Sequence, residues 1–169
     1  MFKKLIVFLI VSLCLTSVAE GKVKDFRLKN LDNKRVSYSK LKGDKVTVID
    51  FWATWCVPCR RSIPKLVAIH ERYREKGVRF IGISVDGPRN LPKVKPHARS
   101  LGITYPVVID INSQIMKELK VISLPTVLLI DQNDEIVYIH RGYRPGDEEI
   151  LEKEIQKLLE KSGSESNED

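Results

Sequence analysis

The chain has 169 residues, which suits one domain with a sizeable hydrophobic core. Hydrophobic residues make up 43% of it and charged residues 30%, the balance of an ordinary globular protein. The formal net charge is +7, but the basic residues form no patch interleaved with aromatic side chains, which argues against nucleic-acid binding. The positive excess instead suits acidic partners or an anionic membrane surface.

Residues 1–19 have the pattern of a secretory signal peptide. Two lysines precede an apolar region, and small side chains at Ser17 and Ala19 suit a cleavage site. The apolar stretch over residues 5–18 has 14 residues, fewer than the ~20 of a membrane-spanning helix. We therefore expect export to the periplasm or to the extracytoplasmic face of the membrane. An uncleaved N-terminal anchor is the alternative.

Residues 22–161 alternate strand and helix patterns, which predicts a single α/β domain. Residues 23–43 alternate apolar and polar side chains around a turn, as in a β-hairpin. Residues 46–52 are apolar on both faces, as in a strand covered on two sides. A helix with apolar positions three and four apart then covers residues 59–76. A second buried strand over residues 80–85 completes a right-handed parallel crossover.

Residues 86–119 are less regular because prolines interrupt them. These prolines exclude one long helix, so we expect a short helix that begins after Pro92 or Pro96 and ends at Gly102. The pattern then predicts a strand over residues 105–109 and a short helix over residues 113–119, with Ser113 as its N-cap.

The C-terminal part returns to the sheet and ends in a helix. Residues 126–130 and 136–140 are apolar runs joined by a short turn, so they form antiparallel strands. Residues 147–161 form an amphipathic helix that begins with acids and ends with lysines, in agreement with the helix dipole. Residues 162–169 are polar, and we expect them to be a disordered acidic tail.

Two cysteines lie where the first buried strand meets the long helix, in the run Trp55-Cys56-Val57-Pro58-Cys59. One helical turn can bring their sulfur atoms together. The free N–H groups at the helix start then stabilise a thiolate on Cys56, the form that attacks disulfides. A structural disulfide usually closes a longer loop, because a short loop constrains the unfolded chain less. The pair therefore indicates redox chemistry.

A metal site is the competing interpretation of the cysteines. Zinc needs about four ligands. Outside the predicted signal peptide the chain offers only Cys56 and Cys59, together with His70, His97 and His140 in no ligand-like spacing. We expect no metal.

The run from Val48 to Cys59, with Phe51-Trp52-Ala53-Thr54-Trp55-Cys56 within it, resembles the active-site strand and helix of the thioredoxin superfamily. The closest likeness is to the TlpA/ResA branch of bacterial extracytoplasmic thiol–disulfide oxidoreductases. Leu124-Pro125-Thr126 is similar to the cis-proline loop of that family. The resemblance spans roughly residues 22–160. It implies a thioredoxin fold with an N-terminal β-hairpin and, over residues 87–109, a helix and strand inserted after the first β–α–β unit.

The resemblance also implies roles for single residues. Cys56 would be the nucleophile and Cys59 the buried resolving thiol, and their redox-active disulfide would be the only cofactor. Pro125 would be cis, and the backbone of Leu124 would pair with an extended substrate. The implied substrate-binding surface comprises Trp55, Pro58, Leu124, Pro125 and Thr126.

Asp50 lies between Ile49 and Phe51 on the first buried strand, where a charge is costly. The resemblance aligns it with the buried aspartate of thioredoxin. Many members of the branch instead carry a glutamate three residues after the second cysteine, where this chain has Ser62. We expect desolvation to raise the pKa of Asp50, which would then shuttle a proton for Cys59. The alternative is an exposed aspartate that merely ends the strand.

The resemblance implies reduction of disulfides in exported proteins such as apocytochrome c. Electrons would come from a membrane reductase of the CcdA/DsbD type, and the protein would act as a monomer. Because Val57 and Pro58 are neutral, we expect a potential nearer ~−270 mV than ~−120 mV.

Other activities compete with this one. A net oxidant or isomerase is one alternative, and a copper carrier is another that the two-residue spacing disfavours. A peroxiredoxin is disfavoured because Thr54 lies two residues before Cys56 rather than three.

Overall fold

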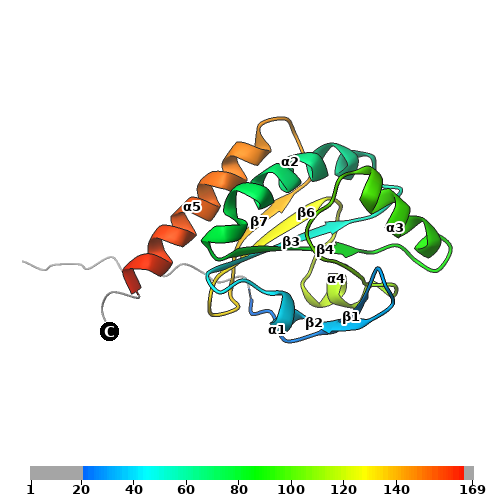
Figure 1. Ribbon diagram of the computed structural model, residues 1–169, viewed down its shortest axis with the longest axis horizontal. Helices are drawn as coiled ribbons and strands as arrows, with labels where there is room; N and C mark the ends of the chain where they lie inside the picture. Colours follow the sequence, from blue (N-terminus) through cyan, green and yellow to red (C-terminus); the bar gives the residue numbers. More distant parts are fainter. Residues whose placement is uncertain (1–20, 166–169) are drawn as a thin grey trace, which may run out of the picture.

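The computed structural model describes residues 21–165, and Figure 1 shows helices packed on a twisted sheet. The predicted signal peptide lies outside this range, as do residues 166–169. In chain order the elements are β1 (Arg27–Asn30), β2 (Arg35–Ser37), α1 (Tyr38–Leu41), β3 (Val46–Trp52), α2 (Val57–Tyr73), the 3-10 helix η1 (Arg74–Lys76), β4 (Val78–Ser84), α3 (Leu91–Ser100), β5 (Val107–Ile109), α4 (Gln114–Glu118), β6 (Thr126–Ile130), β7 (Ile136–Arg141) and α5 (Asp147–Glu165).

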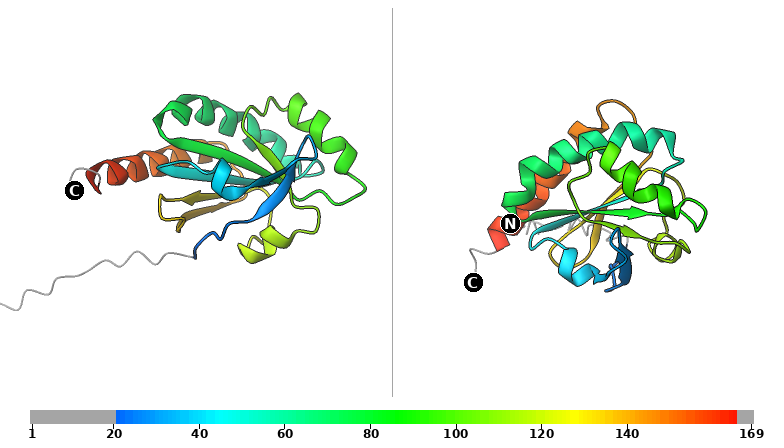
Figure 2. Two further views of the ribbon diagram at one scale, coloured as in Figure 1. Left: turned by 60° about the horizontal axis from the view of Figure 1, so that its bottom comes forward. Right: turned by 45° about the vertical axis from the view of Figure 1, so that its right-hand side comes forward.

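The seven strands form one mixed sheet in the order β2-β1-β5-β4-β3-β6-β7. The predicted crossover is present, because β3 pairs with β4 in parallel. The predicted antiparallel pair of β6 and β7 is also present, and β6 pairs with β3 on its other edge. Figures 1 and 2 show α2 and α5 on one face of the sheet and α4 on the opposite face. This arrangement confirms the predicted thioredoxin-like fold.

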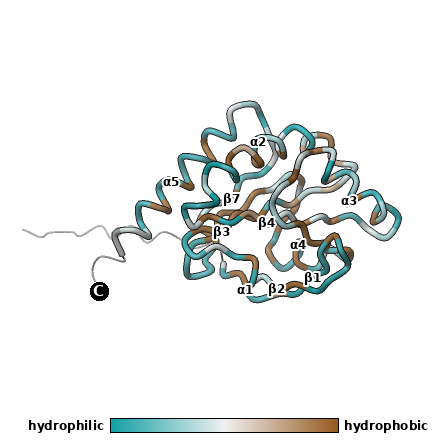
Figure 3. The backbone as a smooth tube through the Cα atoms, viewed as in Figure 1, coloured by the Kyte–Doolittle hydropathy of each residue, from teal (hydrophilic) through white to brown (hydrophobic). Residues whose placement is uncertain are grey.

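Strand β3 lies inside this sheet, between β4 and β6, and all seven of its residues are buried. Its apolar side chains contribute to two apolar clusters, as expected for a strand covered on both faces. Val46 and Val48 join the cluster that contains Leu151 of α5. Ile49 and Phe51 join the other cluster. Figure 3 shows stretches of hydrophobic residues, in brown, along the central strands.

The N-terminal hairpin is present, with β1 and β2 antiparallel, but its second strand is shorter than the pattern suggests. Tyr38 begins α1 instead of continuing β2. Its ring lies 5.3 Å from that of Phe26, and its N–H donates to the Phe26 carbonyl at 2.9 Å. These contacts hold Tyr38 in the core, where the chain leaves β2 and begins α1.

Helix α3 differs from the prediction of a short helix after Pro92 or Pro96. It begins at Leu91 and runs for ten residues with Pro96 inside it. Pro92 is tolerated because the first helical turn has no intrahelical partner for its N–H. Burial of Val94 and Ala98 compensates for the hydrogen bond that Pro96 removes. The chain still leaves the helix at Gly102, as predicted, with a left-handed φ of 71°.

Ser113 is the N-cap residue of α4, as predicted, but its side chain does not make the capping hydrogen bond. Its backbone is left-handed. The carboxylate of Asp110 takes that part instead, since it accepts from the N–H of Gln114 at 2.8 Å and of Met116 at 2.9 Å. Asp110 is held at this place by the end of β5, which local sequence does not reveal.

Helix α5 extends to Glu165, four residues beyond the predicted end. Ser162 is buried, and its hydroxyl donates to the Leu159 carbonyl at 2.9 Å. The predicted disordered tail is therefore wrong for residues 162–165, and the rest of it lies outside the described residues. Within residues 21–165 we find no helix that has both the length and the apolarity to cross a membrane.

Candidate active site

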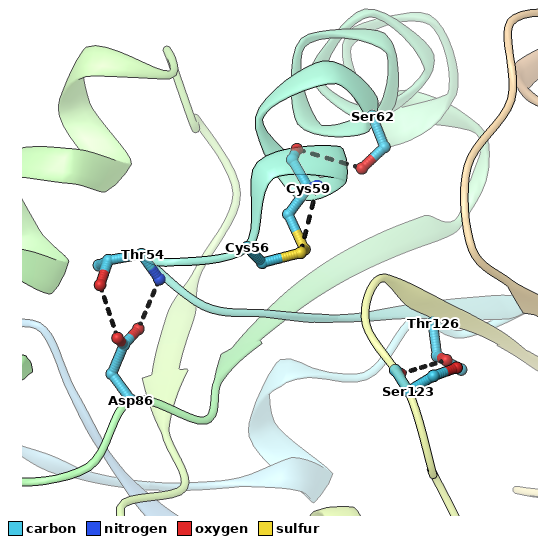
Figure 4. Close-up of a disulfide and its surroundings, with 7 residues drawn as sticks. All are labelled: Thr54, Cys56, Cys59, Ser62, Asp86, Ser123 and Thr126. Carbon is cyan, nitrogen blue, oxygen red and sulfur yellow. Dashed lines mark hydrogen bonds between the residues drawn. A yellow bond between two sulfur atoms is a disulfide. The ribbon is translucent and has the colours of Figure 1, made fainter.

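Cys56 and Cys59 form a disulfide at the point where the chain leaves β3 and enters α2 (Figure 4). The S–S distance is 2.06 Å and the Cα atoms lie 5.3 Å apart. Cys56 is 4% exposed, whereas Cys59 is fully buried. An incoming thiol or disulfide can therefore reach the sulfur of Cys56 more readily than that of Cys59.

The sulfur of Cys56 caps helix α2. Cys56 is the N-cap residue, and its Sγ accepts a hydrogen bond from the backbone N–H of Cys59 at 3.2 Å. Pro58 lies in the first turn, where its missing N–H removes no helical bond. A thiolate at this position would face both this donor and the positive end of the helix dipole, and both lower the pKa of a cysteine.

Asp86 anchors the segment that carries Trp55 and Cys56, and sequence reasoning missed it. Its carboxylate accepts from the Thr54 N–H at 2.9 Å and from the Thr54 hydroxyl at 2.6 Å (Figure 4). It also accepts from the Ser84 hydroxyl at 2.8 Å, and it is fully buried. A signal existed, because Asp86 lies two residues after the end of β4, which pairs with the end of β3.

The cis-proline loop lies beside this segment. The Leu124–Pro125 bond is cis, as we predicted. Thr126 pairs with Phe51 of β3, which places the loop next to the chain that leads to the cysteines. The Thr126 hydroxyl is buried and donates to the Ser123 carbonyl at 2.8 Å, so that side chain shapes the loop (Figure 4).

The other residues expected to bind substrate differ in exposure. Trp55 is 61% exposed, Pro58 is exposed and Leu124 is half-buried, whereas Pro125 is buried. Trp52 is fully buried in the core, as predicted. Sequence reasoning missed Ile122, which is 81% exposed just before the cis-proline loop.

Asp50 is fully buried, so the alternative of an exposed aspartate at the end of the strand is wrong. Its Oδ2 accepts a hydrogen bond from the Tyr105 hydroxyl at 3.2 Å, while Oδ1 has no hydrogen-bond partner in the described structure. Burial raises the pKa of Asp50 from 3.8 to about 7, and the bond from Tyr105 opposes part of that rise. Tyr105 was not predicted as a site residue, since it comes from the loop before β5.

Ser62 lies three residues after the second cysteine, the position where the family resemblance leads one to expect a glutamate. It is buried, and its hydroxyl donates to the carbonyl of Cys59 at 3.2 Å (Figure 4). It therefore contributes a neutral hydroxyl near the second cysteine. Asp50 is the buried acid that this chain provides on β3.

The three histidines lie in different parts of the fold. His70 is buried against the rings of Phe80 and Tyr105, and burial lowers its pKa. His97 stacks on Trp52 with ring centres 6.1 Å apart. His140 contacts Asp147 at 2.9 Å. Across residues 21–165 no three histidine, cysteine, aspartate or glutamate side chains come together as a metal site.

Together these features define a class of protein. A sheet of this order, a disulfide that caps a helix and a neighbouring cis-proline loop are the parts of a thioredoxin-like protein that exchanges disulfides. The Redoxin family model matches residues 19–155, and the chain belongs to that family.

Relatives and solved structures agree with this assignment. The thiol–disulfide oxidoreductase ResA of Geobacillus kaustophilus is 35% identical over 128 residues, which cover 75% of this chain and 72% of that one. ResA of Bacillus subtilis is 31% identical over 129 residues, covering 75% and 69%. A thioredoxin-family thiol:disulfide interchange protein from Chlorobium tepidum has a TM-score of 0.69 at 27% identity, covering 82% and 95%. The chain is a ResA-like thiol–disulfide oxidoreductase.

Proposed function

We propose that this protein reduces disulfide bonds in exported proteins. The observation that carries the proposal is the hydrogen bond from the Cys59 N–H to the Cys56 sulfur, combined with full burial of Cys59. This arrangement stabilises the Cys56 sulfur as an anion nearer the surface and protects the Cys59 sulfur one helical turn deeper. The neutral residues Val57 and Pro58 add no positive partner that would make the protein a strong oxidant.

The reaction starts from the reduced form, with thiols at both positions. The Cys56 thiolate attacks one sulfur of the substrate disulfide, forms a mixed disulfide and releases the other substrate sulfur as a thiolate. The Cys59 thiolate then attacks the Cys56 sulfur, restores the Cys56–Cys59 bond and expels the second substrate thiolate. Two electrons pass from the protein dithiol to the substrate, and the released thiolates take up protons.

Asp50 is proposed to accept the proton from Cys59 in the second step. It lies on the same face of β3 as Val48, whose cluster includes Leu66 of helix α2. A pKa of about 7 lets the carboxyl change its protonation state near neutral pH. Resolution of the mixed disulfide by Asp50→Ala should be slower by about 10- to 100-fold and should lose its dependence on pH near 7. Single-turnover kinetics across pH test this, and a wild-type profile would remove Asp50 from the mechanism.

The location and partners are proposed from the N-terminal pattern and the family resemblance. The signal-peptide pattern supports export to the periplasm or the outer face of the membrane. Substrates would be exported proteins with disulfides, apocytochrome c among them, and a membrane reductase of the CcdA/DsbD type would return electrons to Cys56 and Cys59. The protein would work as a monomer with no cofactor besides its disulfide.

Trapping of the mixed disulfide tests the proposal directly. In Cys59→Ser, the thiol of Cys56, the more accessible of the two, can attack but the resolving thiol is missing, so substrate proteins should remain attached. Expressed in the native host and isolated without reductant, the variant should carry exported cysteine proteins that dithiothreitol releases. Cys56→Ser is the control and should carry none. Equal capture by both variants would contradict the assigned roles.

The reduction potential decides the net direction. We expect a value nearer ~−270 mV than ~−120 mV, for the reason given above for Val57 and Pro58. Equilibration with defined ratios of oxidised and reduced dithiothreitol or glutathione, followed by thiol alkylation, measures it. A value near that of a strong oxidant would favour a net oxidant or isomerase.

A further inference from the structure

A hollow of about 670 Å³ lies beside the candidate active site. Its walls come from Thr54 and Trp55, from Arg60 in the first turn of α2, and from one side of α3 that includes Lys93 and His97. We call it the α3 hollow. Because Thr54 and Trp55 directly precede Cys56, a peptide whose cysteine is bonded to Cys56 would pass its neighbouring residues over or into this hollow.

The charged side chains of the α3 hollow are positive. Arg60 and Lys93 line it, and no aspartate or glutamate does. Both are exposed, and neither belongs to an ion pair in the described part of the chain. The ammonium group of Lys93 donates a hydrogen bond to the side-chain oxygen of the neutral Asn90, at 3.2 Å. These two cations are therefore available to an anionic partner.

The surroundings of the α3 hollow extend this positive region. A second hollow of about 460 Å³ shares Asn90 with it and is also lined by the exposed Arg89. The oxygens of the neighbouring Asp86 carboxylate are buried and engaged by Thr54 and Ser84, and Asp86 forms no ion pair with Arg60 or Lys93 in the described part of the chain. The side chain of Trp55 is largely exposed and supplies an apolar wall of the hollow, next to Cys56 in sequence.

We propose that the α3 hollow selects substrates whose reactive cysteine is flanked by acidic residues. The occupant is an acidic segment of the substrate protein, bound while its cysteine reacts with Cys56. The inference deepens the proposed reductase function and rests on it. It requires no further covalent step, because the charges act on the encounter and on the mixed disulfide.

Disulfide-bonded model peptides test this selectivity. Three peptides have the same ring and differ only in the flanking residues, which are glutamate, glutamine or lysine. The rate constant for their reduction by the fully reduced protein is followed by stopped-flow tryptophan fluorescence. At low ionic strength we expect the glutamate peptide to react at least about five-fold faster than the lysine peptide, and the difference should shrink to within about two-fold at ~0.5 M salt.

Charge reversal in the α3 hollow provides the matched comparison. Lys93→Glu should remove or invert the preference for the glutamate peptide while the rate with the glutamine peptide stays within about two-fold. Lys153→Glu is the control, because it makes the same change of charge on an exposed residue of α5. Lys153 is adjacent to Glu152, whose ion pair with Arg72 lies near the far end of α2.

The possible results distinguish failure of this inference from failure of the proposed reductase function on which it rests. Equal rates for all three peptides at low salt, or equal effects of Lys93→Glu and Lys153→Glu, would overturn the inference while reduction of the glutamine peptide upholds the reductase. If the glutamine peptide is not reduced at all, the proposed function fails and the inference fails with it.

Discussion

Asp50 and Asp86, two buried carboxylates, show how differently the fold treats the same chemical group. Asp86 receives hydrogen bonds from three donors on Thr54 and Ser84. Asp50 receives one, from Tyr105, and its second oxygen has no partner among the described residues. Burial without enough donors favours the protonated form of a carboxyl. Asp50 is therefore suited to proton transfer, and Asp86 to holding the chain in place.

Asp50 should make stability depend on pH. The native carboxyl keeps its proton up to about pH 7, whereas an unfolded aspartate loses it near 3.8. Between these values the native state binds more protons, so stability falls as pH rises. From pH 5 to pH 8 the loss should be about 2–3 kcal/mol. Urea unfolding of the oxidised protein measures it.

Asp50→Asn should remove this loss, because the amide can still accept from Tyr105 but does not titrate. His70 titrates with the opposite sign, since burial lowers its pKa, but it is present in both proteins and cancels in the comparison. Exposed Asp44 supplies the control variant Asp44→Asn. Parallel stability curves for Asp50→Asn and the wild type would show that Asp50 is not protonated in the native protein.

Asp86→Asn should lower the free energy of unfolding by about 2–3 kcal/mol, because the amide nitrogen cannot accept the bonds that Thr54 and Ser84 donate. Thr54→Val removes only the hydroxyl bond and should cost about 1 kcal/mol. Reduction of substrate should also slow in Asp86→Asn, since Thr54 positions the segment with Trp55 and Cys56. Chemical unfolding and peptide-reduction rates measure the two effects. A variant with wild-type values in both assays would rule out the anchoring role.

At the scale of single elements, α2 links structure to chemistry. The sulfur that is proposed to react is also the group that caps this helix. The helix continues through Pro64 to Tyr73, and the chain leaves η1 at Gly77, whose φ of 83° suits glycine. Because the cap and the proposed nucleophile are one atom, a change in the redox state of Cys56 also changes the group that caps the helix.

Cys56→Ser and Cys56→Ala separate capping from disulfide formation. Neither variant can form the Cys56–Cys59 bond, but serine keeps an acceptor for the Cys59 N–H and alanine leaves that donor unpaired. We expect the serine variant to be more stable by about 1 kcal/mol. Thermal or urea unfolding under reducing conditions measures the difference. Equal stabilities would mean that the Cys59 N–H contributes nothing as a capped donor.

At the scale of the whole molecule, the site is positioned by the central strands and by the packing of α2 beside α5. Strand β3 lies between β4 and β6, and α2 packs beside α5 (Figures 1 and 2). Arg72 on α2 donates to Glu152 on α5 through two nitrogen atoms, at 3.1 and 2.7 Å. The core and these contacts hold the active-site segment in place from both sides.

Reduction of the disulfide should therefore leave the domain folded. The bond joins residues only three apart in sequence, and closing so short a loop stabilises a protein by at most about 2 kcal/mol in the chain-entropy model. Urea unfolding with and without dithiothreitol should give cooperative transitions of equal slope that differ by no more than this amount. Loss of cooperativity after reduction would show that the disulfide is structural.

Local sequence was sufficient for the parts of the fold whose signals are local. The apolar run over residues 46–52 defined β3, and the spacing of two cysteines at the start of a helical pattern defined the reactive pair. The cis bond at Pro125 could also be predicted, through the family resemblance of its flanking residues. Each of these features depends on residues within about one helical turn or one strand of each other.

The tertiary structure alone decided which distant residues complete the site. Tyr105 bonds Asp50 across 55 positions, and Asp86 bonds Thr54 across 32. Packing also decided that α3 contains Pro96, since local sequence left open whether the helix begins after Pro92 or after Pro96. Periodicity and spacing show which face of an element is buried, but not which side chain from another element meets it there. The pKa of Asp50 depends on such a contact, because burial raises it and the hydrogen bond from the Tyr105 hydroxyl lowers it.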